Sequence, residues 1–407
     1  MGPEFNSNSQ LIVKKFGGAT LSSPEKIKQV AFQLYQSFNK GQKVVAVVSA
    51  MGNTTNALIK LAHEISPHPS LREMDMLLST GERVSMSLLS MALQDLNCKA
   101  ISFTGSQAGI LTNESHSNAI ITDVKPHRIL NAIANNQVVI LAGFQGMSPL
   151  NKEITTLGRG GSDTTAVSIA AAIGANWCEI LKDVPAIFTA DPKIVSNAKP
   201  INQLTYTQLL NMTFWGAKVL HFRSVELSQK LNVPLYIGPA HSHSEGTWIT
   251  GEELKMNNPK LNENFEATQI LAISSYDEIL CLNHTKNENQ NALNDLQEQL
   301  SDLEIYFPQI LYVEPQKIYF TGPQESMLAI KNSISQLFGF TLDKQKVSSV
   351  TATCTSNSTS QSIQKIFASL KNNNIYYHKI IISGQSVTIF VDSKFYHSTI
   401  TCLHQLI

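Results

Sequence analysis

Hydrophobic positions along the first 240 or so residues follow two different patterns. Short runs that are apolar at nearly every position occupy residues 11–16, 43–50, 138–142, 178–182 and 234–237. Longer stretches in which apolar residues recur with the period of an α-helix occupy residues 24–38, 74–96 and 162–174. Near-continuous apolar strands that alternate with helices indicate a largely parallel sheet sandwiched by helices. The sequence therefore predicts an α/β fold, with ligands at the carboxyl ends of the strands.

The pattern changes after about residue 240. Residues 241–246 are rich in turn formers, and residues 255–264 are polar with several asparagines, which is typical of a linker. Beyond the linker, the order strand, helix, two strands, helix occurs twice, over residues 265–340 and 341–407. We therefore expect one large α/β domain over residues 11–250, followed by two small βαββα units.

Composition limits the classes of function. The 31 basic and 31 acidic residues cancel, which argues against a nucleic-acid partner or a polybasic contact with a membrane. No apolar run approaches the roughly 20 residues of a membrane span. The five cysteines are scattered without metal-ligand spacing, which predicts reduced thiols in a cytoplasmic protein and no metal site. Residues 1–10 are polar and expected to be disordered, and residues 2–5 resemble a cloning remnant.

Two glycine turns carry the first chemical signal. Residues 158–163, Gly-Arg-Gly-Gly-Ser-Asp, stand directly before a helical pattern, and Gly17-Gly18 follow the apolar run that ends at Phe16. Glycine lets the backbone approach an anion, and an arginine fork suits a carboxylate or a phosphate. Taken alone, residues 158–163 are equally consistent with an ordinary N-capped turn. Neither turn is a P-loop or a dinucleotide motif, but two such turns in one α/β pattern favour a bound polyphosphate.

The two turns belong to a longer series of short motifs. In chain order these are residues 15–18 (KFGG), 49–56 (SAMGNTTN), 79–83 (STGER), 143–146 (GFQG), 155–163 (TTLGRGGSD), 183–185 (DVP), 189–193 (TADPK) and 216–221 (GAKVLH). Their order and spacing resemble those of aspartokinases, within the amino-acid-kinase family, over well over half of the chain.

The sequence departs from the family pattern at a few positions. Ala19-Thr20 stand where the family usually has Thr-Ser, Phe188 replaces a tyrosine, and Phe222 replaces a proline. Lys182 replaces a threonine and puts a charge where a neutral group flanks the nucleotide in the family. We expect Lys182 to tune the affinity for ATP without abolishing activity.

The resemblance implies phosphorylation of the side-chain carboxylate of L-aspartate by ATP, with Mg²⁺ arriving on the nucleotide. A free aspartate carboxylate has a pKa of about 4, so the reaction needs no general base. It needs positioning and neutralisation of charge around the transferring phosphoryl group.

The resemblance also assigns roles to individual residues. Lys15 and Lys218 would neutralise the β- and γ-phosphates, Arg159 would clamp the α-carboxylate of aspartate, and Glu82 and Asp163 would face its ammonium group. Of these, the residues implied to be catalytic are Lys15, Lys218, Asp163 and Arg159. The other implied substrate-binding residues are Ser49, Thr55 and Ser162. The other implied ATP-binding residues are Phe16, Gly17, Gly18, Lys182, Asp183, Phe188, Asp191, Lys193 and Val219.

The C-terminal repeat extends the resemblance. Aspartokinases usually end in paired ACT domains, which bind effector amino acids and mediate dimers. The resemblance therefore implies a homodimer, an effector such as lysine or threonine, and a place in lysine, diaminopimelate, threonine and methionine biosynthesis. One departure is that residues 283–290, after the first strand of the repeat, lack the family's glycine.

Two alternatives remain at this point. One is a sister kinase that acts on acetylglutamate, glutamate or UMP, and the segments around Arg159 and Glu82 argue against it. The other is an inactive amino-acid sensor, which the filled charged positions of the phosphate site argue against.

Overall fold

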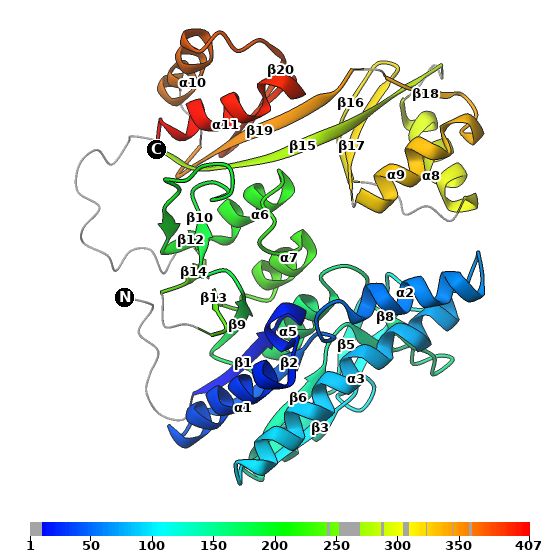
Figure 1. Ribbon diagram of the computed structural model, residues 1–407, viewed down its shortest axis with the longest axis vertical. Coiled ribbons are helices and arrows are strands. Elements are labelled where there is room, and N and C mark those ends of the chain that lie inside the picture. The colour runs from blue at the N-terminus through cyan, green and yellow to red at the C-terminus, as the bar shows by residue number, and fades with distance from the viewer. Residues whose placement is uncertain are drawn as a thin grey trace. The chain divides into compact units, whose positions relative to one another are not determined.

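The computed structural model describes residues 10–241, 245–251, 269–285, 289–303, 309–322, 324–343, 345–357 and 360–407 (Figure 1). Residues 1–9 of the expected disordered start, and the expected linker over residues 255–264, lie outside the described residues. The chain divides into two compact units. Unit 1 is Met1–Phe188, Pro200–Thr213 and Lys218–Phe265, and unit 2 is Thr189–Lys199, Phe214–Ala217 and Glu266–Ile407.

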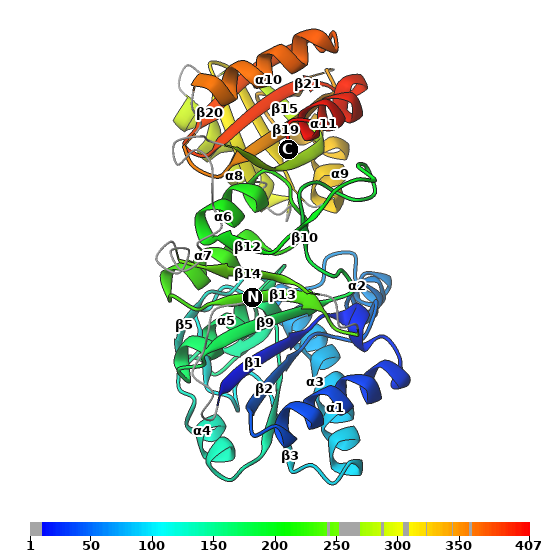
Figure 2. The ribbon, with the colours of Figure 1, turned by 90° about the vertical axis from the view of Figure 1, so that its left-hand side faces the viewer.

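An eight-stranded sheet forms the centre of unit 1 (Figure 2). In spatial order its strands are β12 (Gln203–Thr205), β14 (Thr247–Thr250), β13 (Leu235–Pro239), β9 (Trp177–Lys182), β1 (Leu11–Phe16), β2 (Lys43–Val48), β6 (Val138–Ala142) and β3 (Ala100–Phe103). Every neighbouring pair is parallel except β13 with β14. The predicted, largely parallel sheet is confirmed.

Helices cover both faces of this sheet, which explains the continuous apolar strands. Val44, Ala46 and Val48 of β2 belong to one hydrophobic core with α1 (Pro24–Asn39) and α3 (Leu71–Asp95). Helix α5 (Gly161–Ala172) packs against β1, β2 and β9 and is buried at almost every position. Because neither face of β2 meets water, Val45 and Val47 are buried as well. The three observed helices differ from the predicted ranges by at most three residues at either end.

The remaining elements of unit 1 include a second sheet, a short strand pair and further helices. A second sheet has the order β5 (Ile121–Val124), β4 (Ile110–Thr112), β7 (Gln145–Met147) and β8 (Ile154–Thr156). A short pair consists of β10 (Ile187–Phe188) and β11 (Pro200–Ile201). The other helices are α2 (Thr54–Ile65), α4 (His127–Ala134), α6 (Tyr206–Phe214) and α7 (Phe222–Lys230).

Unit 2 contains one seven-stranded sheet built around a long strand, β15 (Ile270–His284). The sheet order is β16 (Gln309–Glu314), β17 (Lys317–Thr321), β15, β19 (Val347–Cys354), β21 (Ser386–Asp392) and β20 (Tyr377–Ser383), and β18 (Phe340–Leu342) also pairs with β15. The helices are α8 (Asn289–Asp302), α9 (Gln324–Asn332), α10 (Ser360–Asn372) and α11 (Tyr396–His404).

Strand β15 serves both of the predicted βαββα units. Its first half pairs with β19 of the second unit, and its second half pairs with β17 and β18 of the first. A register shift between Tyr276 and Ile279 separates the two halves. The strand order predicted for each repeat is present, but the repeats share a strand.

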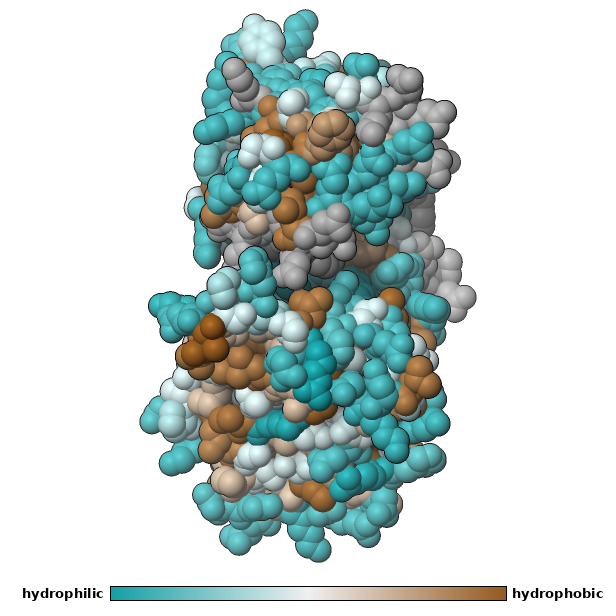
Figure 3. Space-filling view, turned by 90° about the vertical axis from the view of Figure 1, so that its right-hand side faces the viewer, coloured by the Kyte–Doolittle hydropathy of each residue, from teal (hydrophilic) through white to brown (hydrophobic). Residues whose placement is uncertain are grey.

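The surface and the cysteines agree with a packed, reduced protein. Figure 3 shows a face on which hydrophilic residues predominate and hydrophobic ones lie in small, scattered groups. Within the part of the chain that the structure describes, no helix combines the length and apolarity that a membrane crossing requires. All five cysteines are buried and unpaired, as the expectation of reduced thiols requires.

Candidate active site

The strand ends of unit 1 bring the predicted motifs to one edge of the sheet. Backbone hydrogen bonds join them: Gly17 N–H donates to Leu181 O (3.3 Å), Ser49 N–H to Phe16 O (3.1 Å) and Gly143 N–H to Val48 O (3.0 Å). Because β1, β2, β6 and β9 are parallel, all these turns follow carboxyl ends. This is the edge at which open α/β sheets bind ligands.

Two glycines of this edge cannot be replaced without moving backbone. A Cβ on Gly18 would lie 2.7 Å from the carbonyl oxygen of Ala50. Gly160 has φ +72°, and a Cβ there would lie 2.3 Å from Cβ of His221. Gly18 thus lets the turn after β1 approach the turn after β2 closely, and Gly160 lets the Arg159 loop approach the residue that precedes α7.

A buried ion pair lies between two of the predicted catalytic residues. Lys15 Nζ is 2.5 Å from Asp163 Oδ1, and the two side chains are only 8% and 7% exposed. Burial by itself would raise the pKa of Asp163, but the ammonium groups of Lys15 and Lys182 hold that pKa below its ordinary value. Asp163 is therefore a carboxylate, in the first turn of α5 where the helix dipole also favours negative charge.

Lys182 stands at the end of β9 and points into the same group of charges. Its Nζ donates a hydrogen bond to the carbonyl oxygen of Val219. Burial lowers the pKa of Lys182, and Asp163 opposes part of that shift. Lys182 and Val219, both predicted to lie at the nucleotide, are thus in contact, and Lys218 beside them is exposed.

Only one of the two carboxyl oxygens of Glu82 has a hydrogen-bond partner among the described residues. It is buried on α3, where its Oε1 accepts a hydrogen bond from Ala50 N–H at 3.0 Å. Among the described residues, no hydrogen-bond partner reaches the buried Oε2. Burial raises the pKa of Glu82 to about 7, although the Ala50 N–H and Lys15 oppose the shift. A buried carboxyl oxygen without a partner is costly, and a cationic ligand group would satisfy it.

The Arg159 loop connects β8 to α5. Gly158 and Gly160 on either side of Arg159 both have positive φ, +71° and +72°. Arg159 is exposed between them, whereas Ser162 and Asp163 are buried at the start of the helix. Two left-handed glycines turn the chain sharply, so the loop presents the arginine while α5 buries the residues that follow.

The other predicted residues divide between the two units. Phe16, Gly17, Gly18 and Ser49 lie at the strand ends of unit 1, Thr55 lies in the first turn of α2, and Asp183 and Phe188 follow β9. Asp191 and Lys193 belong to unit 2, where Asp191 Oδ1 accepts a hydrogen bond from Lys193 N–H at 2.9 Å. The contact of these two residues with a nucleotide stays a prediction.

The structure adds His221, whose role the sequence did not indicate. Its Nδ1 accepts a hydrogen bond from Arg223 N–H at 3.4 Å at the start of α7. Burial and the neighbouring Arg223 lower the pKa of His221, so the imidazole is neutral at pH 7. A residue just before a helix could have been recognised as a cap, but its packing against Gly160 depends on the tertiary fold.

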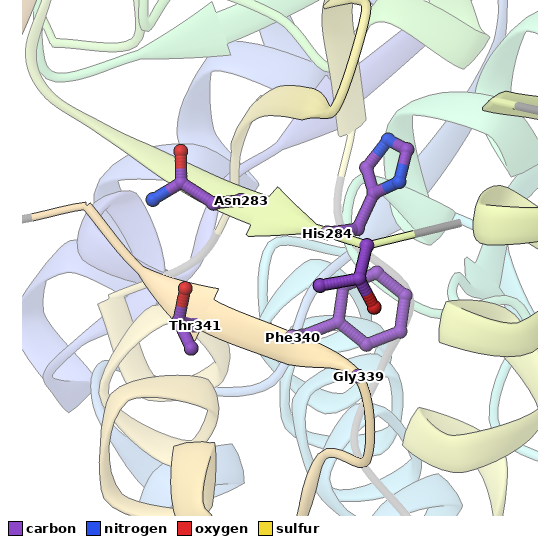
Figure 4. A pocket seen from close by; sticks show the side chains of 6 residues that line it. Asn283, His284, Gly339, Phe340 and Thr341 are labelled. Atoms are coloured by element: carbon purple, nitrogen blue, oxygen red, sulfur yellow. The ribbon is translucent and has the colours of Figure 1, made fainter. Parts of the chain in front are cut away.

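A second feature, in unit 2, is an open pocket of about 200 Å³ between β15 and β18 (Figure 4). His284 is 4% exposed, and no described residue hydrogen-bonds to either of its ring nitrogens. The pocket lies where β15 ends, at the start of the segment 283–290 that lacks the glycine usual in the family. Its lining residues are Asn283, His284, Thr285, Gly339, Phe340 and Thr341.

Comparison with known sequences gives a consistent answer. The family model of the amino acid kinase family matches residues 10–239. The aspartokinase of Mycolicibacterium smegmatis is 49% identical over 241 residues, which cover 59% of this chain and 57% of that protein. Aspartokinase 2 of Bacillus subtilis is 49% identical over 242 residues, which cover 60% of this chain and 59% of that protein. The chain thus spans less than two thirds of the length of these curated relatives.

Solved structures resemble the chain over both units. The Escherichia coli aspartokinase III structure in complex with aspartate and ADP has a TM-score of 0.75 at 21% identity, covering 98% of this chain and 100% of that one. The aspartate kinase from Synechocystis has a TM-score of 0.54 at 31% identity, covering 97% of this chain and 68% of that one. These likenesses confirm the predicted fold class.

Proposed function

The chain belongs to the amino acid kinase family, and on that premise we propose that it is an aspartate kinase. In the proposed reaction a side-chain oxygen of L-aspartate attacks the γ-phosphorus of Mg²⁺-ATP. A new O–P bond forms, the bond from the γ-phosphorus to the β,γ-bridging oxygen breaks, and the products are 4-phospho-L-aspartate and ADP. The name of the curated relatives supports this choice of substrate.

One observation carries the proposal: a buried group of charges at the carboxyl edge of the sheet. Lys15 is paired with Asp163 at 2.5 Å, Lys182 stands beside them, and Glu82 keeps one oxygen without a described partner. Buried charges of this kind cost stability, so a fold that retains several of them in one place uses them for a ligand. Cations suit a polyphosphate, and carboxylates suit the ammonium group of an amino acid.

The cations are assigned to the nucleotide. Lys15 and Lys218 would neutralise the β- and γ-phosphates, Lys182 would add a third positive charge, and the N–H groups of Gly17 and Gly18 lie on the same turn. Charge moves onto the β,γ-bridging oxygen as the phosphoryl group leaves, so these contacts strengthen in the transition state. Mg²⁺ enters with ATP as part of the substrate, held largely by phosphate and water.

The remaining groups are assigned to the amino acid. Arg159 would bind the α-carboxylate as a fork, and Glu82 and Asp163 would accept from the ammonium group. Ser49 and Thr55, on the turn after β2 and the start of α2, would face the reacting carboxylate. That carboxylate is already ionised near pH 7, so the site moves no proton. Catalysis rests on orientation and on the positive charges.

An ADP-release assay with a coupled readout tests the proposal. L-aspartate should give turnover that depends on Mg²⁺-ATP, while acetylglutamate, L-glutamate and UMP should give little above the acceptor-free control. Turnover of UMP or acetylglutamate instead of aspartate would identify a sister kinase. No ADP release with any acceptor, together with calorimetric binding of an amino acid, would identify a sensor.

We assign unit 2 to the control of activity by an effector and to the assembly of a dimer. The repeated βαββα order and the pocket at His284 support a homodimer that binds an effector amino acid, lysine or threonine, at the end of β15. An effector inhibits only if it binds the inactive conformation more tightly than the active one. The product would then serve the cytoplasmic biosynthesis of lysine, threonine and methionine.

Sedimentation and calorimetry test this second assignment. The protein should sediment as a dimer, and lysine or threonine should release heat on binding and lower the initial rate. His284→Leu, in the same assays, should weaken effector binding and leave the uninhibited rate unchanged. A monomer with full activity and no heat from lysine, threonine or methionine would contradict the assignment.

A further inference from the structure

We propose that Asp75 is a positioning residue that fixes the distance between Glu82 and the Arg159 loop, and thereby sets the affinity for aspartate. The inference rests on the proposed function, because it uses Arg159 and Glu82 as the two groups that bind the substrate's α-substituents. Asp75 itself is fully buried on α3 and belongs to none of the recognised motifs.

The carboxylate of Asp75 is surrounded by donors. Its Oδ1 accepts from Thr156 Oγ1 at 2.5 Å and from Ser117 N–H at 3.0 Å, and Ser117 N–H is also 3.1 Å from Oδ2. His116 Nδ1 lies 2.7 Å from Oδ2. A carboxylate can only accept, so His116 carries its hydrogen on Nδ1. Four contacts to one buried carboxylate hold α3 firmly to the segments that supply the donors, because the low local dielectric constant strengthens each contact.

These donors come from two segments that are also tied to each other. His116 and Ser117 belong to the turn between β4 and β5, and Thr156 is the last residue of β8. The N–H of Ala119 donates to the carbonyl oxygen of Thr156 at 2.9 Å. A Cβ on Gly158 would lie 3.0 Å from the carbonyl oxygen of Ser117. The turn and the end of β8 therefore move as one piece.

Arg223 of α7 ties this piece from its other side. Its guanidinium donates to the carbonyl oxygens of Leu157 at 3.0 Å and Ala119 at 2.7 Å. Arg159 follows Thr156 by three positions. The backbone that leads into Arg159 is thus fixed by Arg223 on one side and by Asp75 on the other.

Helix α3 carries Glu82, the second of the two substrate-binding groups whose separation Asp75 fixes. Glu82 follows Asp75 by seven positions, about two helical turns, so both side chains project from the same face. Both are buried. Between them, the carbonyl oxygen of Ser79 accepts from Gln145 Nε2 at 2.9 Å, which attaches β7 to the same face. Helix α3 therefore carries Glu82 and also, through Asp75, holds the start of the Arg159 loop in place.

This arrangement predicts a selective effect on the amino acid. A substrate whose carboxylate meets Arg159 and whose ammonium group meets Glu82 needs those groups at a fixed separation, and a shift of about 1 Å costs up to 100-fold. Lys15 lies on β1 and Lys218 precedes α7, and neither contacts Asp75 or its donors. Loss of Asp75 should therefore change the KM for aspartate and leave the KM for ATP.

The experiment compares Asp75→Asn with wild type in the ADP-release assay, varying each substrate in turn. Asp75→Asn keeps the shape but loses the charge and turns an amide N–H₂ towards donors. We expect the KM for aspartate to rise about tenfold, the KM for ATP to stay within about twofold, and Asp75→Glu to recover part of the loss. Thr112→Val is the matched control, because it breaks the buried 2.6 Å contact between Thr112 of β4 and Thr155 of β8, and neither of these residues donates to Asp75.

A merely structural role gives a different result. In that case Asp75→Asn and Thr112→Val would both lower the melting temperature, and in neither variant would the KM for aspartate change more than the KM for ATP. That result would overturn the inference. If Asp75→Asn does not fold, Thr156→Val, which removes one donor, should give a smaller rise in the same KM. Wild-type enzyme without aspartate-dependent ADP release overturns the proposed function as well, whereas an active wild type with an unmoved KM overturns only the role of Asp75.

Discussion

Glu82 gives the sharpest test of the substrate site, because its charge changes within the working pH range. Its pKa is raised to about 7 by burial in the ligand-free site. Only the ionised carboxylate attracts the ammonium group of aspartate. A group with that pKa is about one tenth ionised at pH 6 and about nine tenths ionised at pH 8. We therefore expect kcat/KM for aspartate to fall about tenfold between pH 8 and pH 6.

The measurement is the pH profile of kcat/KM for aspartate at saturating Mg²⁺-ATP, since this quantity reports the ionisations of the enzyme form that aspartate meets. Glu82→Gln is the control: it should have a low kcat/KM and lose the step near pH 7, so that any slope left over belongs to other groups, such as the nucleotide. A flat wild-type profile, or the same step in Glu82→Gln, would refute the assignment of Glu82 to the ammonium group.

The same pKa predicts an effect on stability. The folded-state pKa lies above the ordinary value of 4.5, so the fold favours the protonated carboxyl and loses stability as the pH rises from about 4.5 to about 7. The loss is on the order of 3 kcal/mol. Glu82→Gln should therefore raise the melting temperature of the ligand-free protein at pH 8 and change it little at pH 5. Equal shifts at both pH values would contradict the raised pKa.

Three further substitutions separate the roles of the cations. Lys15→Ala should lower kcat about 100-fold or more. Because the substitution leaves Asp163 buried without its partner, circular dichroism must accompany the kinetics to check the fold. A large rise in KM with kcat intact would contradict the role of Lys15 in the transition state. Arg159→Ala should mainly raise the KM for aspartate, since it removes a contact to a carboxylate that does not react, and an unchanged KM would exclude the clamp. Lys182→Thr, which restores the residue usual in aspartokinases, should raise the KM for ATP about fivefold, or about 1 kcal/mol, and leave the KM for aspartate unchanged. If neither KM changed, Lys182 would have no role in substrate binding.

The elements that the sequence predicted well are those whose signal is local. Apolar runs that stay apolar at every position identify strands covered on both faces, and β2 is such a strand. The cap at Ser23, whose side chain accepts from Lys26 N–H, and the proline after it mark the start of α1. The glycine turns at Gly18 and Gly160 are recognisable because a Cβ there would meet the carbonyl oxygen of Ala50 and the side chain of His221, respectively, so that only glycine fits.

Features that depend on distant partners could not be predicted in this way. The pairing of Lys15 with Asp163 joins β1 to α5, far apart in the sequence, and nothing local marks it. Asp75 is one of several acids on α3, and its contacts come from the turn at His116 and from β8. Strand β15 continues past a register shift at Tyr276, and its pairing with both repeats depends on strands that follow it in the chain.

Under the proposed function, the charges of the ligand-free site account for a need for both substrates. Lys15 and Lys182 face Asp163, while Glu82 is half protonated near pH 7, so the buried groups carry more positive than negative charge. A polyphosphate supplies the missing negative charge and releases Asp163 from its role as the counterion of Lys15. The ammonium group of aspartate then stabilises the ionised form of Glu82 and gains a second partner in Asp163. Each ligand thus supplies a charge that the folded protein lacks, and Mg²⁺-ATP, which binds only the folded state, should raise the melting temperature in proportion to the logarithm of its concentration.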